Sequence, residues 1–298
     1  MTRSRGGAAS ASRLSLLALC LISAVCLCDC AWFSARRAMN RGVNFYKSKE
    51  YDKAADAFKQ AISINPAYAE AHLDLGLTYM SLYEPGSEHP KDVEYATGAI
   101  DAFKKYIELT PESDKAKEYL INVCKSARRM QDAIDFFLPD IEKNPQDLKK
   151  VRMIAVLYQM GGNSEKAIEW YAKVAEIDPT NPEAHYSVGV ACWARSYNSI
   201  DLDYESRMKL VETGIASMDR ALQLRTDYYE AYSYLGLLYR EKAKYDISPA
   251  QSVMWRQKAD ELLAKAMELR NKQLAAQAAA AAKAQGDTAE APAKSEGK

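Results

Sequence analysis

The chain has 298 residues, and its 40 basic and 40 acidic residues give a formal net charge of zero. This balance argues against a nucleic-acid binder, which needs a positive face to neutralise phosphates. The 13 glycines and 10 prolines are too few for an all-β fold rich in turns, whereas 48% apolar residues are enough for a substantial core. Only Cys124 and Cys192 lie outside the first thirty residues, so the body has no disulfide framework.

The N-terminal segment, residues 1–33, is predicted to be a signal peptide or a membrane anchor. Arg3, Arg5 and Arg13 precede an apolar run over residues 14–25, which is the layout of a secretory signal. Extended to Phe33, with Asp29 as its one charge, the run reaches the length of about twenty residues that a membrane-spanning helix needs. We therefore expect an exported protein of the cell envelope, periplasmic and membrane-anchored through its N-terminus. The residues leave open whether the segment is cleaved, lipidated or retained.

Four cysteines, Cys20, Cys26, Cys28 and Cys30, lie in this segment. Cys26 is the candidate lipidation site, because a cysteine just after an apolar run resembles a bacterial lipoprotein signal. Val25 precedes it where that family has Gly or Ala, which weakens the match. A metal site is disfavoured because no second pair of ligands lies within reach.

The body carries an internal repeat of 34 residues. Pro111, Pro145 and Pro179 follow one another at this spacing, as do Gly42 and Gly76. Small residues recur at fixed positions of this repeat, and large residues recur at the positions between those small residues. The pattern resembles that of the tetratricopeptide repeat (TPR) family, W-x2-L-G-x2-Y followed by A-x3-F and Pro. The resemblance covers six repeats, at residues 35–68, 69–113, 114–147, 148–181, 182–228 and 229–272.

This resemblance implies an all-α fold, a right-handed TPR solenoid of six helix-turn-helix repeats over residues 34–270. The second, fifth and sixth repeats exceed 34 residues, and their extra sequence falls between the two helices of the pair. Ser248-Pro249 and His89-Pro90 are typical of an N-cap followed by proline at the first helical position, so the spacing predicts three lengthened second helices. In the last two repeats we expect Met208 and Val211 to pack on three residues of the neighbouring long helix, Val253, Met254 and Trp255.

Residues 271–298 are predicted to be an Ala-rich, low-complexity tail. Alanine favours continuation of the last helix through residues 273–285, but an all-alanine face buries little apolar surface. The residues after 285 include no large apolar side chain and are expected to be disordered.

The body lacks residue patterns that support catalysis. His72 and His185 occupy the aromatic first slot of their repeats and are expected to be packing residues, while His89 is expected in a solvated loop. Cys124 and Cys192 occupy slots that face the partner helix, which predicts buried, inert thiols. The acidic run Asp201, Asp203 and Glu205 lacks the glycine and the distal glutamate of a calcium loop. We expect no enzyme, no cofactor and no metal.

The resemblance implies that the first helix of each repeat lines a concave groove. The residues predicted to point into it are Met39, Val43, Tyr46, Leu73, Leu77, Met80, Asn122, Lys125, Arg152, Val156, Tyr186, Val190, Trp193, Leu237 and Arg240. This groove has two apolar ends and a polar middle, which favours a protein or peptide partner.

Several alternatives stay open at this point. The groove side chains can instead be buried within the array, or the C-terminal helix can occupy the groove. A rival function is a glycan- or peptidoglycan-binding accessory protein that uses Tyr186, Trp193 and Tyr234. An enzyme is the third and least favoured class.

Overall fold

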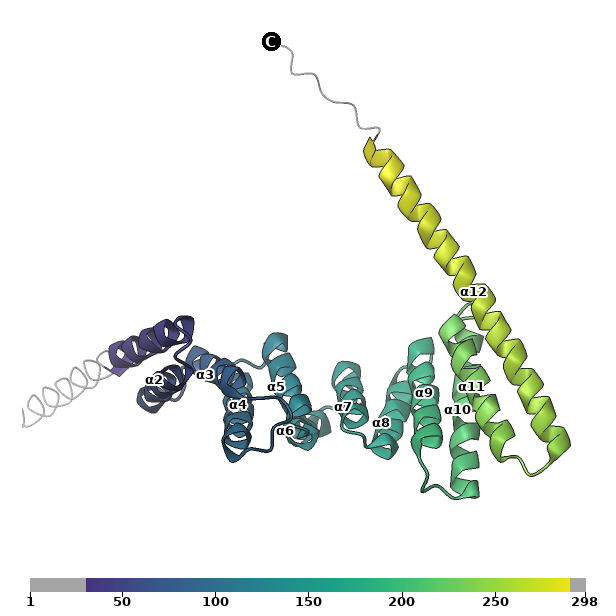
Figure 1. The fold of residues 1–298 in the computed structure, drawn as a ribbon, viewed down its shortest axis with the longest axis horizontal. Helices are drawn as coiled ribbons and strands as arrows, with labels where there is room; N and C mark the ends of the chain where they lie inside the picture. The colour runs from purple at the N-terminus through teal and green to yellow at the C-terminus, as the bar shows by residue number, and fades with distance from the viewer. Residues whose placement is uncertain (1–30, 290–298) are drawn as a thin grey trace, which may run out of the picture. The chain divides into compact units, whose positions relative to one another are not determined.

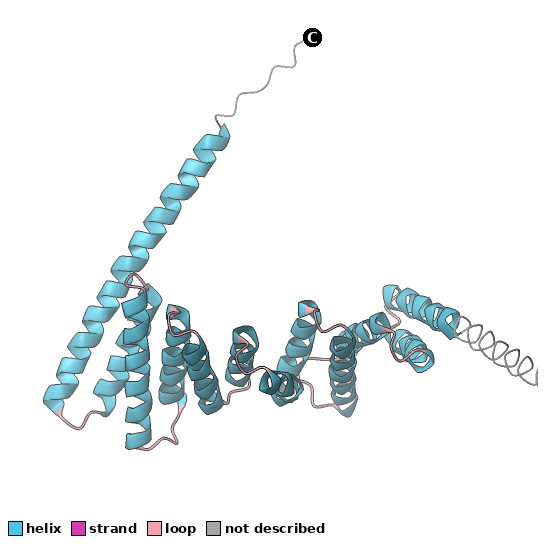
Figure 2. Ribbon diagram, turned by 180° about the vertical axis from the view of Figure 1, so that it is seen from behind, coloured by secondary structure: helices cyan, strands magenta, loops and turns pink. Residues whose placement is uncertain are grey.

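A computed structural model describes residues 31–289, with side chains up to residue 282. Residues 1–30, including the candidate lipidation site Cys26, lie outside the described residues, as do residues 290–298. Within the described residues every regular element is a helix and no strand occurs (Figures 1 and 2). The chain divides into two compact units, the first ending at Phe136 and the second beginning at Phe137.

The first unit is built from successive helices that pack pairwise in chain order. Its helices are residues 31–47, α2 (Tyr51–Ile64), α3 (Ala69–Leu82), α4 (Pro90–Leu109), α5 (Asp114–Ser126) and the beginning of α6 (Met130–Lys143). The helix starts follow the sequence signals. His89 caps α4 by accepting the Lys91 amide at 3.3 Å, with Pro90 at the first helical position, and Ser113 caps α5.

The second unit continues the same plan. It contains the end of α6 and then α7 (Leu148–Met160), α8 (Ser164–Ile177), α9 (Pro182–Asn198), α10 (Tyr204–Leu224), α11 (Tyr229–Tyr245) and α12 (Pro249–Ala289). The side chains of Asp147, Asn163, Asn181 and Asp203 each accept an amide of the helix that follows.

Small residues allow the two helices of a repeat to approach closely, as the repeat pattern predicts. A Cβ added at Gly76 would lie 2.6 Å from Cε1 of Phe103, which is fully buried. Gly42 faces the buried ring of Phe58 in the same way. These contacts explain why the glycine slot repeats along the chain.

The histidines in the first slots are structural, as expected. Nε2 of His72 lies 2.9 Å from the carbonyl oxygen of Pro66, and Nε2 of His185 lies 3.0 Å from that of Pro179. His72 is buried and His185 is half-buried. Each ring therefore fixes the turn that precedes its own repeat.

The three lengthened second helices are confirmed, and the inserted sequence of the last two repeats also lengthens their first helices. Helices α4 and α10 have 20 and 21 residues and α12 has 41, against 14 in α2, α6 and α8. The first helices α9 and α11 are also long, at 17 residues each, against 13 in α7. No proline or glycine interrupts residues 190–198 or 237–245, so both helices of these repeats are extended.

The expected contact between the long second helices is wrong. Val253 and Met254 are 52% and 58% exposed, so they do not cover α10. The reason is that α12 packs on α11, where the Trp255 ring stacks on Tyr239 with 5.6 Å between centroids.

Helix α12 continues past the repeat pattern to Ala289, so the predicted Ala-rich extension is helical (Figure 1). All side chains of residues 271–282 are exposed. This part of the helix therefore does not fill a groove in the described structure, which removes that alternative. Among the described helices, none combines the length and the apolar character needed to cross a membrane.

Candidate functional site

Five aromatic rings form a continuous series across α9, α11 and the turn that precedes α11 in the second unit, and we call this series the aromatic face. In spatial order its members are Tyr228, Tyr186, Tyr234, Trp193 and Tyr197. The successive ring centroids are 5.0, 5.6, 5.3 and 5.1 Å apart. Distances in this range are those of favourable offset or edge-to-face pairs.

Helical spacing places these rings together. Tyr186, Val190, Trp193 and Tyr197 follow one another at intervals of four, three and four residues, which puts them on one stripe of α9. Tyr234 of α11 reaches across to both Tyr186 and Trp193. Most of these residues rest on a buried apolar cluster that includes Met218, Leu235 and Leu238.

The exposure of the aromatic face increases along the series. Tyr228 is only 5% exposed, Tyr186, Tyr234 and Trp193 are half-buried, and Tyr197 is 58% exposed. Trp193 and Tyr197 are stacked with an interplanar angle of 17°. The exposed end of the series is thus a flat platform, and the opposite end of the series is buried in the core.

The buried end is held by a cation and stays neutral. The guanidinium carbon of Arg225 lies 3.2 Å from the centroid of the Tyr228 ring, and its Nη1 lies 2.8 Å from Oε1 of Glu183. Burial raises the pKa of Tyr228 to about 12 and also raises the pKa of Tyr186. Both phenols therefore remain protonated at neutral pH.

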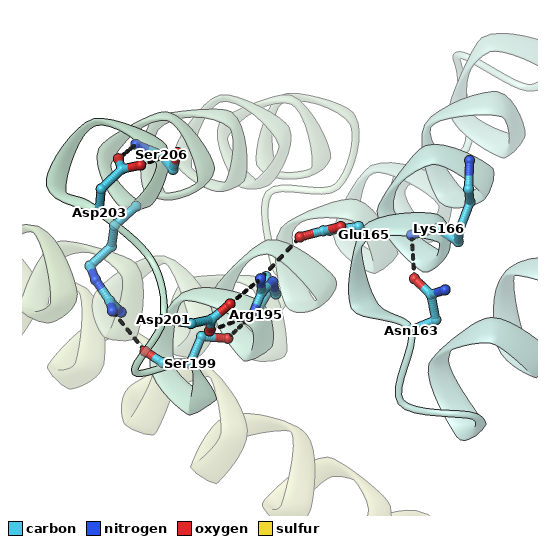
Figure 3. A network of polar contacts seen from close by, with 9 residues as sticks. Asn163, Glu165, Lys166, Arg195, Ser199, Asp201, Asp203 and Ser206 are labelled. Atoms are coloured by element: carbon cyan, nitrogen blue, oxygen red, sulfur yellow. Dashed lines mark hydrogen bonds and ion pairs between the residues drawn. The ribbon is translucent and has the colours of Figure 1, made fainter.

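A polar network on the opposite side of α9 from the aromatic stripe fixes the turn between α9 and α10 (Figure 3). Nη2 of Arg195 lies 3.1 Å from Asp201 and 3.0 Å from Glu165 of α8. The hydrogen bond from Arg195 is the main reason that the pKa of Asp201 is lowered. Asp203 accepts the amide of Ser206 at 2.7 Å and caps α10.

These contacts assign the acidic run of Asp201, Asp203 and Glu205 to a charged surface turn. Asp201 and Asp203 serve different partners, an arginine and a helix start. No cluster of potential metal ligands occurs among the residues that the structure describes.

The predicted groove residues of the second unit are only partly brought together. Tyr186, Val190 and Trp193 belong to the aromatic face, and Leu237 is half-buried on α11. Arg240 is exposed and pairs with Asp260 at 3.0 Å, whereas Arg152 and Val156 are exposed on α7.

In the first unit the prediction is wrong for Met39. Its helical position coincides with that of Ala35, Ala38 and Gly42, so it is only 7% exposed and packs inside the unit. The other apolar candidates are half-buried and the two polar ones are exposed: Val43, Tyr46, Leu73, Leu77 and Met80, and then Asn122 and Lys125.

Sequence reasoning missed Tyr197 and Tyr228. Tyr197 lies in the extension of α9, outside the repeat pattern, although its spacing from Trp193 was a usable signal. Tyr228 lies in a turn, just before α11. A hollow of about 630 Å³ on α6 and α8 was also missed, and it is lined in part by Leu138, Trp170 and Lys173. The Nζ of Lys173 lies 3.9 Å from the centroid of the Trp170 ring.

The two cysteines of the body are buried, as predicted. Burial raises the pKa of Cys124 to about 11 and that of Cys192 to about 12, so neither is an activated nucleophile.

Comparison with known families agrees with this architecture. The TPR repeat model matches residues 42–82 and 156–194, one segment in each unit. The chain therefore carries tetratricopeptide repeats in both units. These repeats generally mediate protein–protein interaction, and their fold is generally that of a scaffold.

Individual proteins are similar to this chain at low sequence identity. A probable UDP-N-acetylglucosamine–peptide N-acetylglucosaminyltransferase SPINDLY from Hordeum vulgare is 24% identical over 154 residues, which is 50% of this chain. The match spans only 15% of that protein's length. Among solved structures, YrrB, described as a TPR protein with an unusual peptide-binding site, is 19% identical with a TM-score of 0.36, covering 65% of this chain and 88% of YrrB. MamA is 24% identical with a TM-score of 0.36, covering 72% of this chain and 97% of MamA.

Proposed function

We propose that this chain is a non-catalytic scaffold that binds an extended or helical segment of a partner protein on the aromatic face. The observation that carries the proposal is the stacked pair of Trp193 and Tyr197, which is exposed at one end and continuous with the core at the other. Tryptophan and tyrosine are frequent anchors of protein interfaces because they offer a large area at a low cost in conformational entropy.

The surroundings of the pair fit a peptide. The hydroxyls of Tyr186 and Tyr234 are potential hydrogen-bond partners for a peptide backbone. On the opposite side of α9, Arg195 is held by two carboxylates, so the helix that carries the rings is ordered before a partner arrives. Preorganisation lowers the entropic cost of binding.

The proposal includes a location in the bacterial cell envelope, exported and tethered through residues 1–33. Its support is the basic and apolar pattern of that segment, most of which lies outside the described residues.

A glycan ligand is the second candidate. The flat, stacked platform of Trp193 and Tyr197 favours it, because a sugar ring can lie on such a surface through its apolar face. A peptidoglycan-binding accessory role would follow from that contact.

The test is a capture experiment from a solubilised envelope fraction with a matched pair of variants. Tyr197→Ala removes the exposed ring of the aromatic face, and Tyr204→Ala removes a tyrosine of similar exposure, 51%, on α10. Circular dichroism establishes that both variants are folded.

We expect a protein partner to be retained by the wild type and by Tyr204→Ala and lost by Tyr197→Ala. Equal retention by all three proteins would refute the aromatic face as the binding surface. Retention on purified peptidoglycan that depends on Tyr197, without any captured protein, would establish the glycan candidate instead.

A further inference from the structure

The helix over residues 31–47 has two faces of different character. Ala35, Ala38, Met39 and Gly42 are buried against the first unit. The opposite side exposes aromatic and basic side chains, and we call it the N-terminal face: Trp32, Phe33, Arg36, Arg37, Arg41 and Lys47. At 100° per residue these six positions cover about half of the helix circumference.

The N-terminal face is strongly positive in a chain whose total charge is zero. Residues 31–49 contain five basic residues and no acidic residue. The Arg36 guanidinium lies 5.4 Å from the centre of the Trp32 ring, and Arg41 donates to the amide oxygen of Gln60 at 2.5 Å. Within the described structure, Arg36, Arg37 and Arg41 form no ion pair.

Two large aromatic side chains stand at the beginning of this face. Trp32 is 55% exposed and Phe33 is 63% exposed, and both precede the arginines by one turn. Exposed apolar rings beside arginines that form no ion pair are not needed for the packing of the unit, whose core lies on the other side of the helix. Such a surface is typical of a contact site.

We infer that the N-terminal face lies on an anionic lipid surface. Aromatic rings prefer the boundary between the headgroups and the acyl chains, and arginines are attracted to the negative headgroups. The helix over residues 31–47 is amphipathic, as membrane-surface helices are. Its small-residue side packs on the protein, and its aromatic and basic side faces the lipid. The first repeat therefore contacts the membrane through this face while it remains folded.

The position of this face along the chain supports a lipid partner over a nucleic acid. Thirty residues precede the helix, and they include the apolar run of residues 14–25. That run ends seven residues before Trp32, so a lipid-bound N-terminus would bring this face to the bilayer surface. The inference deepens the proposed tether and is independent of the aromatic face.

The experiment uses the full chain and two kinds of vesicle, phosphatidylcholine alone and phosphatidylcholine with phosphatidylglycerol. Sedimentation gives the partition coefficient, and brominated lipids report on tryptophan depth by quenching. The charge-reversal variant is Arg36→Glu with Arg37→Glu. Its matched control carries the same charge change at two exposed positions of α12, Arg256→Glu with Lys258→Glu.

We expect phosphatidylglycerol to strengthen binding of the wild type and of the control, and we expect this gain to disappear in Arg36→Glu/Arg37→Glu. Each basic residue near an anionic surface contributes about fivefold to binding, so reversing the charge of two should weaken binding at least about 25-fold. Quenching of tryptophan fluorescence by brominated lipid should be weaker in Trp32→Phe, which retains the other three tryptophans.

Binding to neutral vesicles measures the N-terminal tether alone, so the tether and the anionic-lipid contact of the N-terminal face are tested separately. An equal gain from phosphatidylglycerol in the charge-reversal variant would overturn the inference, even if the tether holds. Salt-sensitive binding to duplex DNA or RNA through the same arginines, without an effect of anionic lipid, would overturn it as well.

Discussion

Nη1 of Arg207 lies 3.6 Å from Oε1 of Glu241, and both side chains are only 5% exposed. Arg207 belongs to the first turn of α10, and Glu241 to the last part of α11. The same guanidinium donates to the carbonyl oxygens of Ser196 and Ser199 at the end of α9, and its carbon lies 4.4 Å from the Tyr245 ring centroid. One side chain thus joins three helices in the inserted part of the last two repeats.

Replacement of Arg207 by methionine should lower the free energy of unfolding by about 3–5 kcal/mol, because Glu241 would stay buried without a positive partner. The double variant Arg207→Met/Glu241→Gln should recover a large part of this loss, since it removes the uncompensated charge. Urea denaturation monitored by circular dichroism measures both variants. A double variant no more stable than Arg207→Met would show that the lost carbonyl contacts, and not the buried charge, dominate.

Alanine at two equivalent glycine slots should have unequal effects. At Gly76 the new Cβ would meet the rigid Phe103 ring, whereas at Gly189 it would meet the flexible end of Met218, in each case at 2.6 Å. Overpacking costs about 1–3 kcal/mol, and alanine returns up to about 1 kcal/mol of helix propensity. We expect Gly76→Ala to destabilise α3 and α4 clearly and Gly189→Ala to change α9 and α10 less. Hydrogen exchange of peptides from these helices measures the two effects separately, and a reversed order would contradict the explanation from ring rigidity.

The two buried thiols should resist alkylation in the folded protein. With pKa values of about 11 for Cys124 and about 12 for Cys192, at most about one thiol in a thousand is ionised at pH 8. Peptide mapping after iodoacetamide treatment should find both unmodified in the native chain and both modified in urea. Rapid native modification of either residue would show that its helix pair opens readily.

The same thiols make stability fall with rising pH in the alkaline range. Burial raises their pKa in the folded state above the reference value of 9.0, so the folded chain holds these protons more tightly than the unfolded chain. Their contribution is complete below about pH 9 and is lost as the pH rises towards 11 and 12. The variant Cys192→Ser should weaken this decline in urea titrations at increasing pH, and an unchanged slope would assign it to other groups.

Substitutions along the aromatic face should separate folding from binding. Tyr186→Ala removes a half-buried ring that contacts Tyr228 and Tyr234, and we expect a loss of about 2–4 kcal/mol in stability. Tyr197→Ala should leave stability within about 0.5 kcal/mol, because the ring is largely exposed, and should abolish partner capture. Thermal unfolding followed by circular dichroism provides the stability values. If Tyr197→Ala were as destabilising as Tyr186→Ala, the stacked platform would be a structural element.

The repeat architecture could be predicted from the sequence because its determinants are local. The glycines at 42 and 76, the prolines that follow the second helices of the first four repeats and the N-cap residues act within one helix pair. Their spacing alone therefore indicates where helices begin, end and approach one another. His72 and His185 could be assigned to packing for the same reason, since each contacts a carbonyl only six residues before it.

What only the tertiary structure decided depends on neighbouring helices. The slot rule placed Met39 in a groove, but its helix turns it toward the buried side, and Tyr197 is exposed because α9 extends beyond the pattern. The rule also did not reveal that the inserted sequence lengthens both helices of the last two repeats, or that Arg207 and Glu241 meet between them. Residue spacing fixes the phase of a side chain on its own helix, whereas its burial and its partners depend on which surfaces the adjacent helices cover.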